Sequence, residues 1–251
     1  MTTLSPPLAM ASSPSGGDLG SFPGNGIAVV FGAGGGIGRA LAVRLRTSRR
    51  FSRVLGFSRS STPAVDLLDE ASLKRAAAFA DAAGEVRLVI DATGFLHDET
   101  QGPEKTWREL DPAKLARAFA LNAIGPALIM KHLLPLLPPA GKAVFATLSA
   151  RVGSIADNQL GGWYGYRASK AALNQLVRTA AIELRRRRPE AICVALHPGT
   201  VETRLSSPFV KNGLDVQSPG RAAARLLVVV DGLGPDQSGG FFDHRGLTVP
   251  W

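Results

Sequence analysis

The chain has little of what disulfide-bonded, metal-binding or membrane-spanning proteins require. Its 251 residues include one cysteine, Cys193, so no disulfide can form within the chain. The apolar context "AICVAL" favours a buried side chain at this position over a catalytic thiol. The four histidines show no H-x-x-x-H spacing, so we expect no metal site. No uninterrupted apolar run reaches the roughly 18 to 20 residues of a membrane-spanning helix, so we expect no membrane partner.

Targeting signals are also missing. Residues 1–25 are rich in Ser, Pro and Gly and contain no Lys or Arg. A secretory signal needs a basic start and an apolar middle, and a transit peptide needs arginines. We therefore predict a disordered tail over residues 1–25 and one domain over residues 26–251. Together with the single cysteine, this composition predicts a cytoplasmic protein.

Negative charge is in short supply, since the net charge is +9. Much of the excess lies in "RLRTSRRFSR" (44–53) and "RRRRPE" (185–190), where basic residues near the end of a predicted helix favour the negative end of its dipole. Neither run has the interleaved aromatic residues of a single-strand binding groove. We interpret both as solvated surface and expect no nucleic-acid partner.

Apolar runs alternate with helical patterns along the rest of the chain. We predict strands at 27–31, 53–58, 86–94, 142–150, 191–199 and, as a short last strand, within 238–246. Helices are predicted at 37–47, 69–84, 111–136, 163–188 and 220–233. Nearly all-apolar strands that alternate with helices are typical of a parallel sheet covered on both faces. The sequence thus predicts an α/β fold, a single doubly wound Rossmann-type domain with a parallel sheet of about seven strands.

A glycine-rich loop, "VVFGAGGGIGRAL", lies between the first strand and the first helix. Glycines are needed where the backbone must turn sharply or approach a phosphate at a helix N-terminus. The spacing G-x-x-x-G-x-G fits at Gly32, Gly36 and Gly38, whereas G-x-G-x-x-G fails because residue 37 is Ile. A dinucleotide site is indicated, and a tight turn without a ligand is the alternative.

Two tyrosines precede a lysine in "WYGYRASKAALN". Residues four apart on a helix share a face, so Tyr166 and Lys170 point the same way and Tyr164 does not. A nearby ammonium favours the phenolate and lowers the pKa of a tyrosine, which suits proton exchange in a carbonyl/alcohol interconversion. A surface Tyr–Lys pair is the simpler alternative. However, Ser149 leaves the preceding strand at the edge where the glycine loop and this helix are expected to meet.

These motifs together resemble the short-chain dehydrogenase/reductase family over nearly all of residues 26–251. The resemblance is carried by "GAGGGIG" (32–38), "DATG" (91–94), "LNAIGP" (121–126), "TLSARVG" (147–153), "YRASK" (166–170) and "HPGTVET" (197–203). Within the family, "DNQLGGWYGYRASKAALN", "ALHPGTVET" and the ending "SGGFF…VPW" resemble the C-factor or sniffer-like carbonyl-reductase branch.

The resemblance implies four catalytic residues. Tyr166 would exchange the proton at the substrate oxygen, and Lys170 would lower its pKa and bind the nicotinamide ribose. Ser149 would hold the carbonyl oxygen, and Asn122 would position a water that relays protons to Lys170. For Asn122 the alternative is a satisfied polar group in a helix kink, because Gly-Pro follows at 125–126.

The resemblance also implies a set of cofactor-binding positions. They are Gly32, Gly36, Ile37, Gly38, Arg39, Ser58, Arg59, Asp66, Leu67, Ala92, Gly94, Tyr166, Lys170, Pro198, Gly199, Val201 and Thr203. After the second strand, where an NAD site places an acid, the chain has Ser58 and Arg59, which suit a 2′-phosphate. Arg39 is a candidate for a second cation, and Asp66 is expected at the adenine edge. We therefore expect NADPH to be preferred over NADH, with a solvated loop at 58–59 as the alternative.

Two departures from the family pattern accompany these matches. Phe31 replaces the threonine often found before the first glycine, and Asp91 and Thr93 replace an amide and an alanine. We expect both departures to touch cofactor affinity more than chemistry.

The sequence gives less information about the substrate-binding residues. Residues 203–220 are expected to cover the pocket as a lid, and its residues Leu205, Phe209, Val210 and Leu214 suggest a partly apolar ligand. Trp163 and Leu160 are candidates for the opposite wall.

Two functions remain open. One is an NADP(H)-linked oxidoreductase acting on a small-molecule carbonyl compound or alcohol. The other is a dinucleotide-binding signalling or interaction protein with little turnover. The chain contains neither a G-x-S-x-G elbow nor a G-x-x-x-x-G-K-[ST] loop, which excludes the usual serine hydrolase and P-loop motifs. Apolar positions on the helices at 111–136 and 163–188 exceed what one sheet face needs, which predicts a homodimer or homotetramer.

Overall fold

Six parallel strands form the central sheet of the computed structural model, which describes residues 18–209 and 215–251. The strands are β1 (Ile27–Phe31), β2 (Arg53–Phe57), β3 (Val86–Asp91), β4 (Ala143–Leu148), β5 (Ala191–His197) and β8 (Phe241–Asp243). Their spatial order is β2-β1-β3-β4-β5-β8. From β1 the chain moves to β2 on one side and then crosses back to β3 on the other side of β1. The carboxyl ends of β1 and β3 therefore flank the crevice where doubly wound folds bind ligands.

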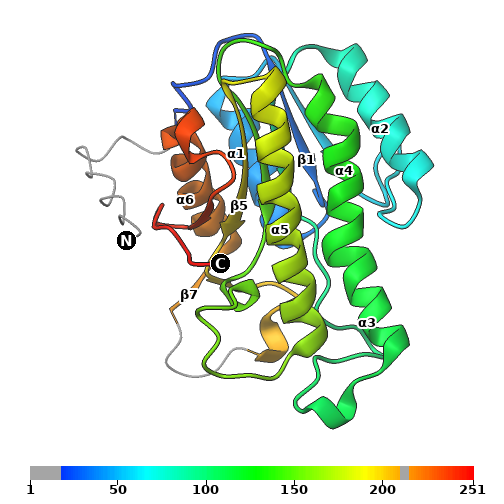
Figure 1. The fold of residues 1–251 in the computed structure, drawn as a ribbon. Coiled ribbons are helices and arrows are strands. Elements are labelled where there is room, and N and C mark those ends of the chain that lie inside the picture. Colours follow the sequence, from blue (N-terminus) through cyan, green and yellow to red (C-terminus); the bar gives the residue numbers. More distant parts are fainter. Residues whose placement is uncertain (1–17, 210–214) are drawn as a thin grey trace.

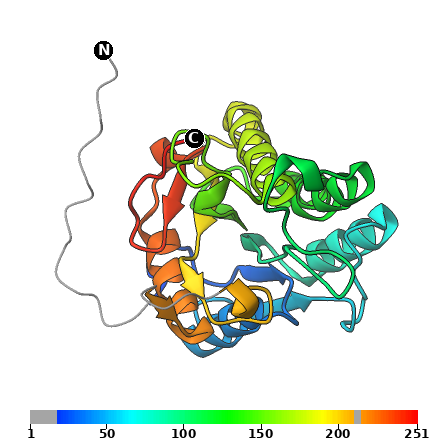
Figure 2. The ribbon, with the colours of Figure 1, turned by 90° about the horizontal axis from the view of Figure 1, so that it is seen from below.

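Helices cover both faces of the sheet (Figures 1 and 2). One layer consists of α1 (Gly36–Ser48) and α6 (Pro219–Gly232). The other consists of α2 (Glu70–Ala83), α4 (Gly125–Leu133) and α5 (Tyr164–Arg187). A continuous helical segment leads into α4 through α3 (Pro112–Phe119) and a π-helical turn, η2 (Ala120–Ile124). Figure 2 looks onto the edge where the carboxyl ends of the strands and the start of α5 lie.

The shorter elements lie mainly at the sheet edges. They are the 3-10 turns η1 (Trp107–Glu109), η3 (Leu134–Leu136), η4 (Arg151–Gly153), η5 (Ser207–Phe209) and η6 (Pro235–Gln237). A separate two-stranded parallel ladder pairs β6 (Thr200–Val201) with β7 (Val216–Gln217).

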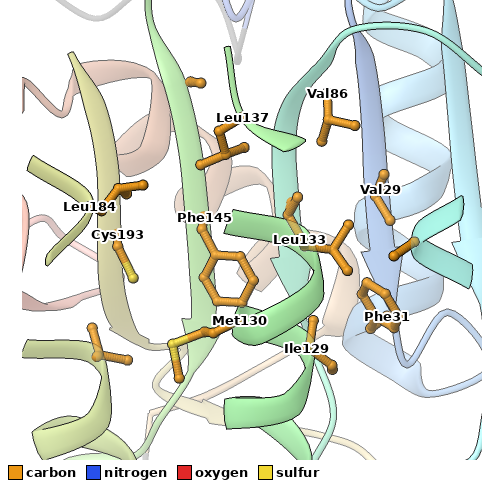
Figure 3. Packing of buried hydrophobic residues seen from close by; sticks show 14 of the residues in the cluster. Val29, Phe31, Val86, Ile129, Met130, Leu133, Leu137, Phe145, Leu184 and Cys193 are labelled. Atoms are coloured by element: carbon orange, nitrogen blue, oxygen red, sulfur yellow. The ribbon is translucent and has the colours of Figure 1, made fainter. Parts of the chain in front are cut away.

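Alternation along the strands sends successive side chains into two different cores. In β1, Val29 and Phe31 pack toward α4 and α5, whereas Ala28 and Val30 pack toward α1 and α6. Figure 3 shows the first core, where Ile129, Met130 and Leu133 of α4 lie against Phe145 and Cys193 of the sheet and their neighbours. Cys193 is completely buried, as its apolar context predicts.

Side-chain caps account for three of the helix starts. Asp69 accepts from Ala71 N before α2, Asp111 accepts from Lys114 N before α3, and Ser218 accepts from Arg221 N before α6. α1 and α5 have no side-chain cap of their own. α1 and α5 carry the cofactor and tyrosine motifs, and α4, which also lacks a side-chain cap, continues directly from η2.

Two predictions need correction. The main sheet has six strands rather than about seven, because the chain between β2 and β3 forms one helix and turns and adds no strand beyond β2. The tail does not extend through residue 25: Leu19 and Phe22 are buried in the core beside α1, and Ser21 N donates to Asp231 Oδ1 at 3.1 Å. Residues 1–17 lie outside the described residues.

Within the described ranges, one segment, Pro112–Leu136, is long and apolar enough to cross a membrane by length and composition. Its buried side covers the sheet through Ile129, Met130 and Leu133. A core helix passes the same test, so we interpret this segment as the sheet-covering helix that the sequence predicts.

Candidate functional site

The glycine loop is closely packed in a way that allows no side chains at two of its positions. Gly32 has a φ of +75°, and a Cβ there would lie 2.8 Å from the Ala92 carbonyl oxygen. A Cβ on Gly38 would stand 2.2 Å from the Gly32 carbonyl oxygen. Gly34, Gly35 and Gly36 are exposed. At Gly34 an added Cβ would have room, because its nearest neighbour would be Ser58 Cβ at 3.4 Å. The first and last glycines therefore shape the turn, and the middle ones leave its outer surface bare.

This loop fits the phosphates of a dinucleotide. The N-terminus of α1 has no side-chain cap, and its first turn carries no acidic residue that would repel an anion. A Cβ on Gly36 would come within 3.0 Å of Thr203 Cγ2 and 3.5 Å of Pro219 Cγ. The segment after β5 thus lies directly against the loop, as expected for residues that share one cofactor.

The residues expected near the adenosine ribose lie beside the glycine loop. Gly34 faces Ser58, whose Oγ is 3.1 Å from Ser60 Oγ, and Ser58 N donates to Ser61 Oγ at 2.9 Å. Arg39 and Arg59 are exposed. Ser58, Ser60 and Ser61 form a serine cluster, of which the sequence predicts only Ser58 as a site residue. Asp66 is also exposed, and its Oδ1 accepts from Leu68 N at 2.9 Å.

Tyr166 and Lys170 share one face at the start of α5, as their spacing predicts. The Lys170 Nζ lies 6.0 Å from the centroid of the Tyr166 ring and donates to the Leu148 carbonyl at 2.8 Å. Lys170 is buried, and this burial lowers its pKa to about 8, with Asp91 opposing the shift. Tyr164 is on another side of the helix, against the cavity described below.

The expected lowering of the pKa of Tyr166 is not what this arrangement gives. Burial raises the pKa of the phenol to about 12, because desolvation disfavours the charged phenolate. At neutral pH the phenol is therefore protonated, which is the form that a general acid requires.

Asn122 is completely buried in the π-helical turn η2. Its Nδ2 donates to the Phe95 carbonyl at 2.8 Å and to Ser169 Oγ at 3.1 Å, and its Oδ1 accepts from Phe95 N at 2.7 Å. The side chain thus ties the segment after β3 to α5, next to Lys170. Asn122 is thus a fully hydrogen-bonded polar group in a distorted part of the helix, as the alternative given in the sequence analysis predicts. π-helical turns of this kind are also frequent at functional sites.

Ser149 directs its hydroxyl into the protein. The residue is 3% exposed, and its Oγ donates to Asn174 Oδ1 at 2.6 Å. Asn174 is one turn after Lys170 and also donates to the Gly153 carbonyl at 3.4 Å. Among the described residues no hydrogen bond joins Ser149 to Tyr166, so holding a substrate oxygen requires the hydroxyl to leave Asn174.

Asp91 lies closer to the chemistry than the sequence suggested. Its buried carboxylate accepts from Thr93 N and Oγ1 at 3.0 and 2.6 Å and from Thr147 Oγ1 at 2.7 Å. Its charge raises the pKa of Lys170, whose Nζ donates to the carbonyl of Leu148, the residue after Thr147. The departure at Asp91 therefore concerns Lys170, the lysine of the Tyr166–Lys170 pair. Desolvation raises the pKa of Asp91, and the bonds from the threonines and the charge of Lys170 oppose that shift.

Glu104 is a site residue that sequence reasoning missed. It is 4% exposed, and its Oε2 accepts from Gly165 N at 3.0 Å. Its main-chain carbonyl accepts from Trp163 N at 2.5 Å. A lone acid 61 residues before Gly165 carries no local signal for this contact, because the cap is made through the tertiary fold.

A row of aromatic rings leads away from Tyr166. Trp163 contacts Tyr166 edge to face at 6.2 Å between centroids and Phe209 at 5.2 Å, and Phe209 contacts His97 at 5.3 Å. His97 Nε2 is also 3.1 Å from the Leu205 carbonyl oxygen. Phe209 is expected on the lid and Trp163 on the opposite wall, whereas in the structure the two rings are in contact. Leu160 is not part of a wall, since it is 91% exposed, and Val210 and Leu214 lie outside the described residues.

The loop after β5 brings the remaining cofactor positions to this edge. Gly199 has a φ of +79°, and Gln217 Nε2 donates to the Pro198 carbonyl at 2.5 Å. Val201 is buried in the β6–β7 ladder, and Thr203 reaches Gly36 as described above. Leu67 lies against Gly125 at the start of α4, and Gly94 lies near Lys170 Nζ and Asn122 Oδ1.

A separate cavity of about 520 Å³ lies on the Tyr164 side of α5. It is lined by residues 152–155 and by Tyr164, Arg167 and Ala171, among others, and lacks Tyr166 and Lys170. Within the described ranges no group of three His, Cys, Asp or Glu side chains is placed to hold a metal ion.

Comparisons with known proteins identify the family of the chain. The family model described as "Enoyl-(Acyl carrier protein) reductase" matches residues 32–226. C-signal of Myxococcus xanthus is 42% identical over 145 residues, 57% of this chain and 82% of that protein. A 1-hydroxy-2-glutathionyl-2-methyl-3-butene dehydrogenase of Rhodococcus sp. (strain AD45) is 31% identical, covering 75% of this chain and 79% of that protein.

Solved structures match the fold across most of the chain. NADPH-bound carbonyl reductase from chicken fatty liver superposes with a TM-score of 0.79 at 25% identity, covering 91% of this chain and all of that one. The carbonyl reductase Sniffer of D. melanogaster gives 0.77 at 22% identity, with the same coverage, and supports the fold alone. From the family model, the relatives and the site geometry, we conclude that the chain belongs to the short-chain dehydrogenase/reductase family and is an oxidoreductase.

Proposed function

We propose that this enzyme interconverts a carbonyl compound and an alcohol by hydride transfer with NADP(H), using Tyr166 as general acid and base. The observation that carries the proposal is the Tyr166–Lys170 pair on the first turns of α5, with Lys170 buried and Tyr166 partly exposed, at the same sheet edge as the glycine loop and the uncapped start of α1. Bound NADPH supplies the hydride, and the protein supplies orientation and the proton.

The residues divide this work as follows. The protonated phenol of Tyr166 donates its proton to the substrate oxygen during reduction and accepts it back during oxidation. Lys170, charged below a pKa of about 8, stabilises the phenolate left behind. Asn122 bonds both the Phe95 carbonyl and Ser169 of α5, and so holds the segment after β3 against α5 next to Lys170. Ser149 is assigned to the carbonyl oxygen once its hydroxyl leaves Asn174.

NADP(H) is the proposed cofactor, with NADPH preferred over NADH. Ser58 and its neighbours Ser60 and Ser61 gather hydroxyl groups beside the glycine loop. Arg39 directly follows the glycine loop in sequence, Arg59 directly follows Ser58, and both are exposed. Hydroxyls and guanidinium groups suit a phosphate dianion. The NADPH-bound carbonyl reductase from chicken supports the cofactor class.

The substrate is proposed to have an apolar body, because Trp163 lies against Tyr166 and the rings of Phe209 and His97 continue from Trp163. A turnover assay tests the proposal: NADPH oxidation is followed at saturating cofactor with a panel of ketones, aldehydes and diketones, and the alcohol product is identified. Turnover of at least one apolar carbonyl compound is expected. NADPH binding without turnover across the panel would instead favour a binding protein.

That binding protein is the second candidate, and the observation in its favour is the relative named C-signal. A dinucleotide-binding signalling protein with little turnover does not need a general acid, so the retained Tyr166–Lys170 pair favours the enzyme.

Assembly and location are proposed on narrower grounds. Ile124 on η2 and Leu176 and Ile182 on α5 are exposed apolar side chains on the two helical segments predicted to pair, which supports a homodimer or homotetramer. Light scattering at micromolar concentration tests this, and a monomer would contradict it. The single cysteine supports a cytoplasmic location, which fractionation of cells would check.

A further inference from the structure

The catalytic helix starts without a cap of its own. Trp163, at the N-cap position of α5, has φ 54° and ψ 42°, a left-handed conformation that is uncommon for a bulky residue, and it makes no side-chain cap bond. Tyr166 is in the first turn of this helix. Its position therefore depends on whatever holds that turn in place.

Glu104 holds it from a distant part of the chain. Its Oε2 accepts from the main-chain N–H of Gly165, the residue before the tyrosine, at 3.0 Å. Its own carbonyl accepts from Trp163 N, so the loop after β3 binds two main-chain N–H groups at the helix start, those of Trp163 and Gly165. A Cβ on Gly165 would lie only 2.9 Å from Glu104 Oε1 and 3.2 Å from Leu115 Cδ2, so the helix start is packed closely against both.

The contact is specific in its geometry. Glu104 is 4% exposed, and its Oε1 is buried with no hydrogen-bond partner among the described residues. A carboxylate at a helix N-terminus is favoured by the helix dipole, which offsets part of the cost of burying it. Because no donor faces Oε1, an NH2 group in its place would lose no hydrogen bond, whereas Oε2 cannot be removed without leaving Gly165 N unpaired.

The rest of the same loop is anchored separately. Asp98 accepts from Thr100 N and Gln101 N, and Gln101 Nε2 donates to the Lys114 carbonyl at 3.2 Å. Gln101 is as buried as Glu104 but binds α3. The loop therefore offers a matched control for any change at Glu104.

We propose that Glu104 is a positioning residue for the reaction: as a tertiary N-cap of α5, it sets the place of the Tyr166 phenol relative to Lys170. This inference rests on the proposed function for its kinetic consequence, though not for its structural one. Displacement of a reacting group by about 1 Å can cost on the order of 100-fold in rate.

The test compares three substitutions and one control. Glu104→Gln keeps an acceptor oxygen at the same reach and removes the charge. Glu104→Asp keeps the charge and withdraws the oxygen, and Glu104→Leu removes both. Gln101→Leu is the control. For each variant kcat, the KM for the carbonyl substrate and the Kd for NADPH are measured.

We expect Glu104→Gln to stay within threefold of the wild-type kcat, and Glu104→Asp and Glu104→Leu to lose at least about tenfold in kcat with an unchanged Kd for NADPH. Gln101→Leu should match the wild type in kcat. If Glu104→Leu does not fold, the order of the Gln and Asp variants decides. Aspartate equal to or better than glutamine would mean that charge matters rather than capping, and the proposal would be wrong. Parallel losses in kcat and NADPH affinity would also overturn it.

A readout independent of turnover separates this inference from the proposed function. The chain has only two tyrosines, so 3-fluorotyrosine in a Tyr164→Phe background reports Tyr166 alone by fluorine NMR. The Asp and Leu variants should move its resonance, and the Gln variant and the Gln101→Leu control should not. A resonance unmoved by Glu104→Leu overturns the positioning role, even if no substrate is ever turned over. A wild-type enzyme that turns over no carbonyl compound counts against the proposed function alone.

Discussion

The cofactor region and the catalytic region share one sheet edge but are built in opposite ways. The phosphate turn and the serine cluster come from β1, α1 and the segment after β2, within residues 27–61. The proposed catalytic region takes Asp91, Glu104, Asn122, Ser149 and Lys170 from five separate segments, and each of these side chains bonds to a residue of another segment. Local backbone geometry therefore governs the first region, and long-range contacts govern the second. Substitutions in the first should change NADPH binding, and substitutions in the second should change kcat.

The largest expected effect is in the catalytic region. Tyr166→Phe removes the general acid and should lower kcat on the order of 10² to 10⁴-fold, with the Kd for NADPH nearly unchanged. Tyr164→Phe, on another face of α5, should be mild. Steady-state kinetics and fluorescence titration with NADPH measure both. A Tyr166→Phe enzyme that keeps more than about a tenth of kcat would show that the wrong tyrosine had been assigned.

Two glycines of the cofactor region allow a matched comparison. Gly38→Ala places a methyl group where a Cβ would stand 2.2 Å from the Gly32 carbonyl oxygen, so the turn must open. We expect the Kd for NADPH to rise on the order of 10- to 100-fold, about 1.4 to 2.7 kcal/mol. Gly34→Ala, with 3.4 Å to the nearest side-chain atom, should bind nearly as the wild type does. Equal Kd values for the two variants would break the link between turn geometry and binding.

The choice of dinucleotide is a smaller effect in the same region. NADPH should exceed NADH by at least about tenfold in kcat/KM, or 1.4 kcal/mol, and Arg59→Ala should remove most of that gap. Arg53→Ala is the control, because Arg53 is an exposed cation at the other end of β2. The ratio of kcat/KM values for the two cofactors is the measurement, and a ratio unchanged by Arg59→Ala would show that the phosphate is held elsewhere.

The smallest predicted effect concerns pH and Asp91. Lys170 is charged below its pKa of about 8 and neutral above it, so kcat/KM for carbonyl reduction should fall as pH rises through about 8. Because the carboxylate of Asp91 raises the pKa of Lys170, Asp91→Asn should move this fall to lower pH, by about one unit or less. Asp243→Asn, in a buried aspartate on β8, should leave the profile in place. A profile unmoved by Asp91→Asn would mean that Asp91 is protonated in the enzyme.

Sequence reasoning reached what depends on neighbours along the chain. The alternating strands and helices, the three-glycine spacing and the Tyr166–Lys170 face all follow from local periodicity, and the structure has each of them. It did not reach the cap from Glu104, the bond from Ser149 to Asn174 or the action of Asp91 on Lys170, because each joins residues far apart in sequence. The raised pKa of Tyr166 escaped it for the same reason, since burial is a property of the assembled fold.

The central claim is that this protein transfers hydride from NADPH to a carbonyl carbon with a proton from Tyr166. Its most direct test uses NADPH carrying deuterium at the transferable position of C4, incubated with an apolar ketone and either wild-type enzyme or Tyr166→Phe. The account predicts deuterium on the carbinol carbon of the alcohol made by the wild type, and almost no alcohol from the variant although it binds NADPH equally well. Alcohol without deuterium at that carbon, or equal alcohol from both enzymes, would contradict it.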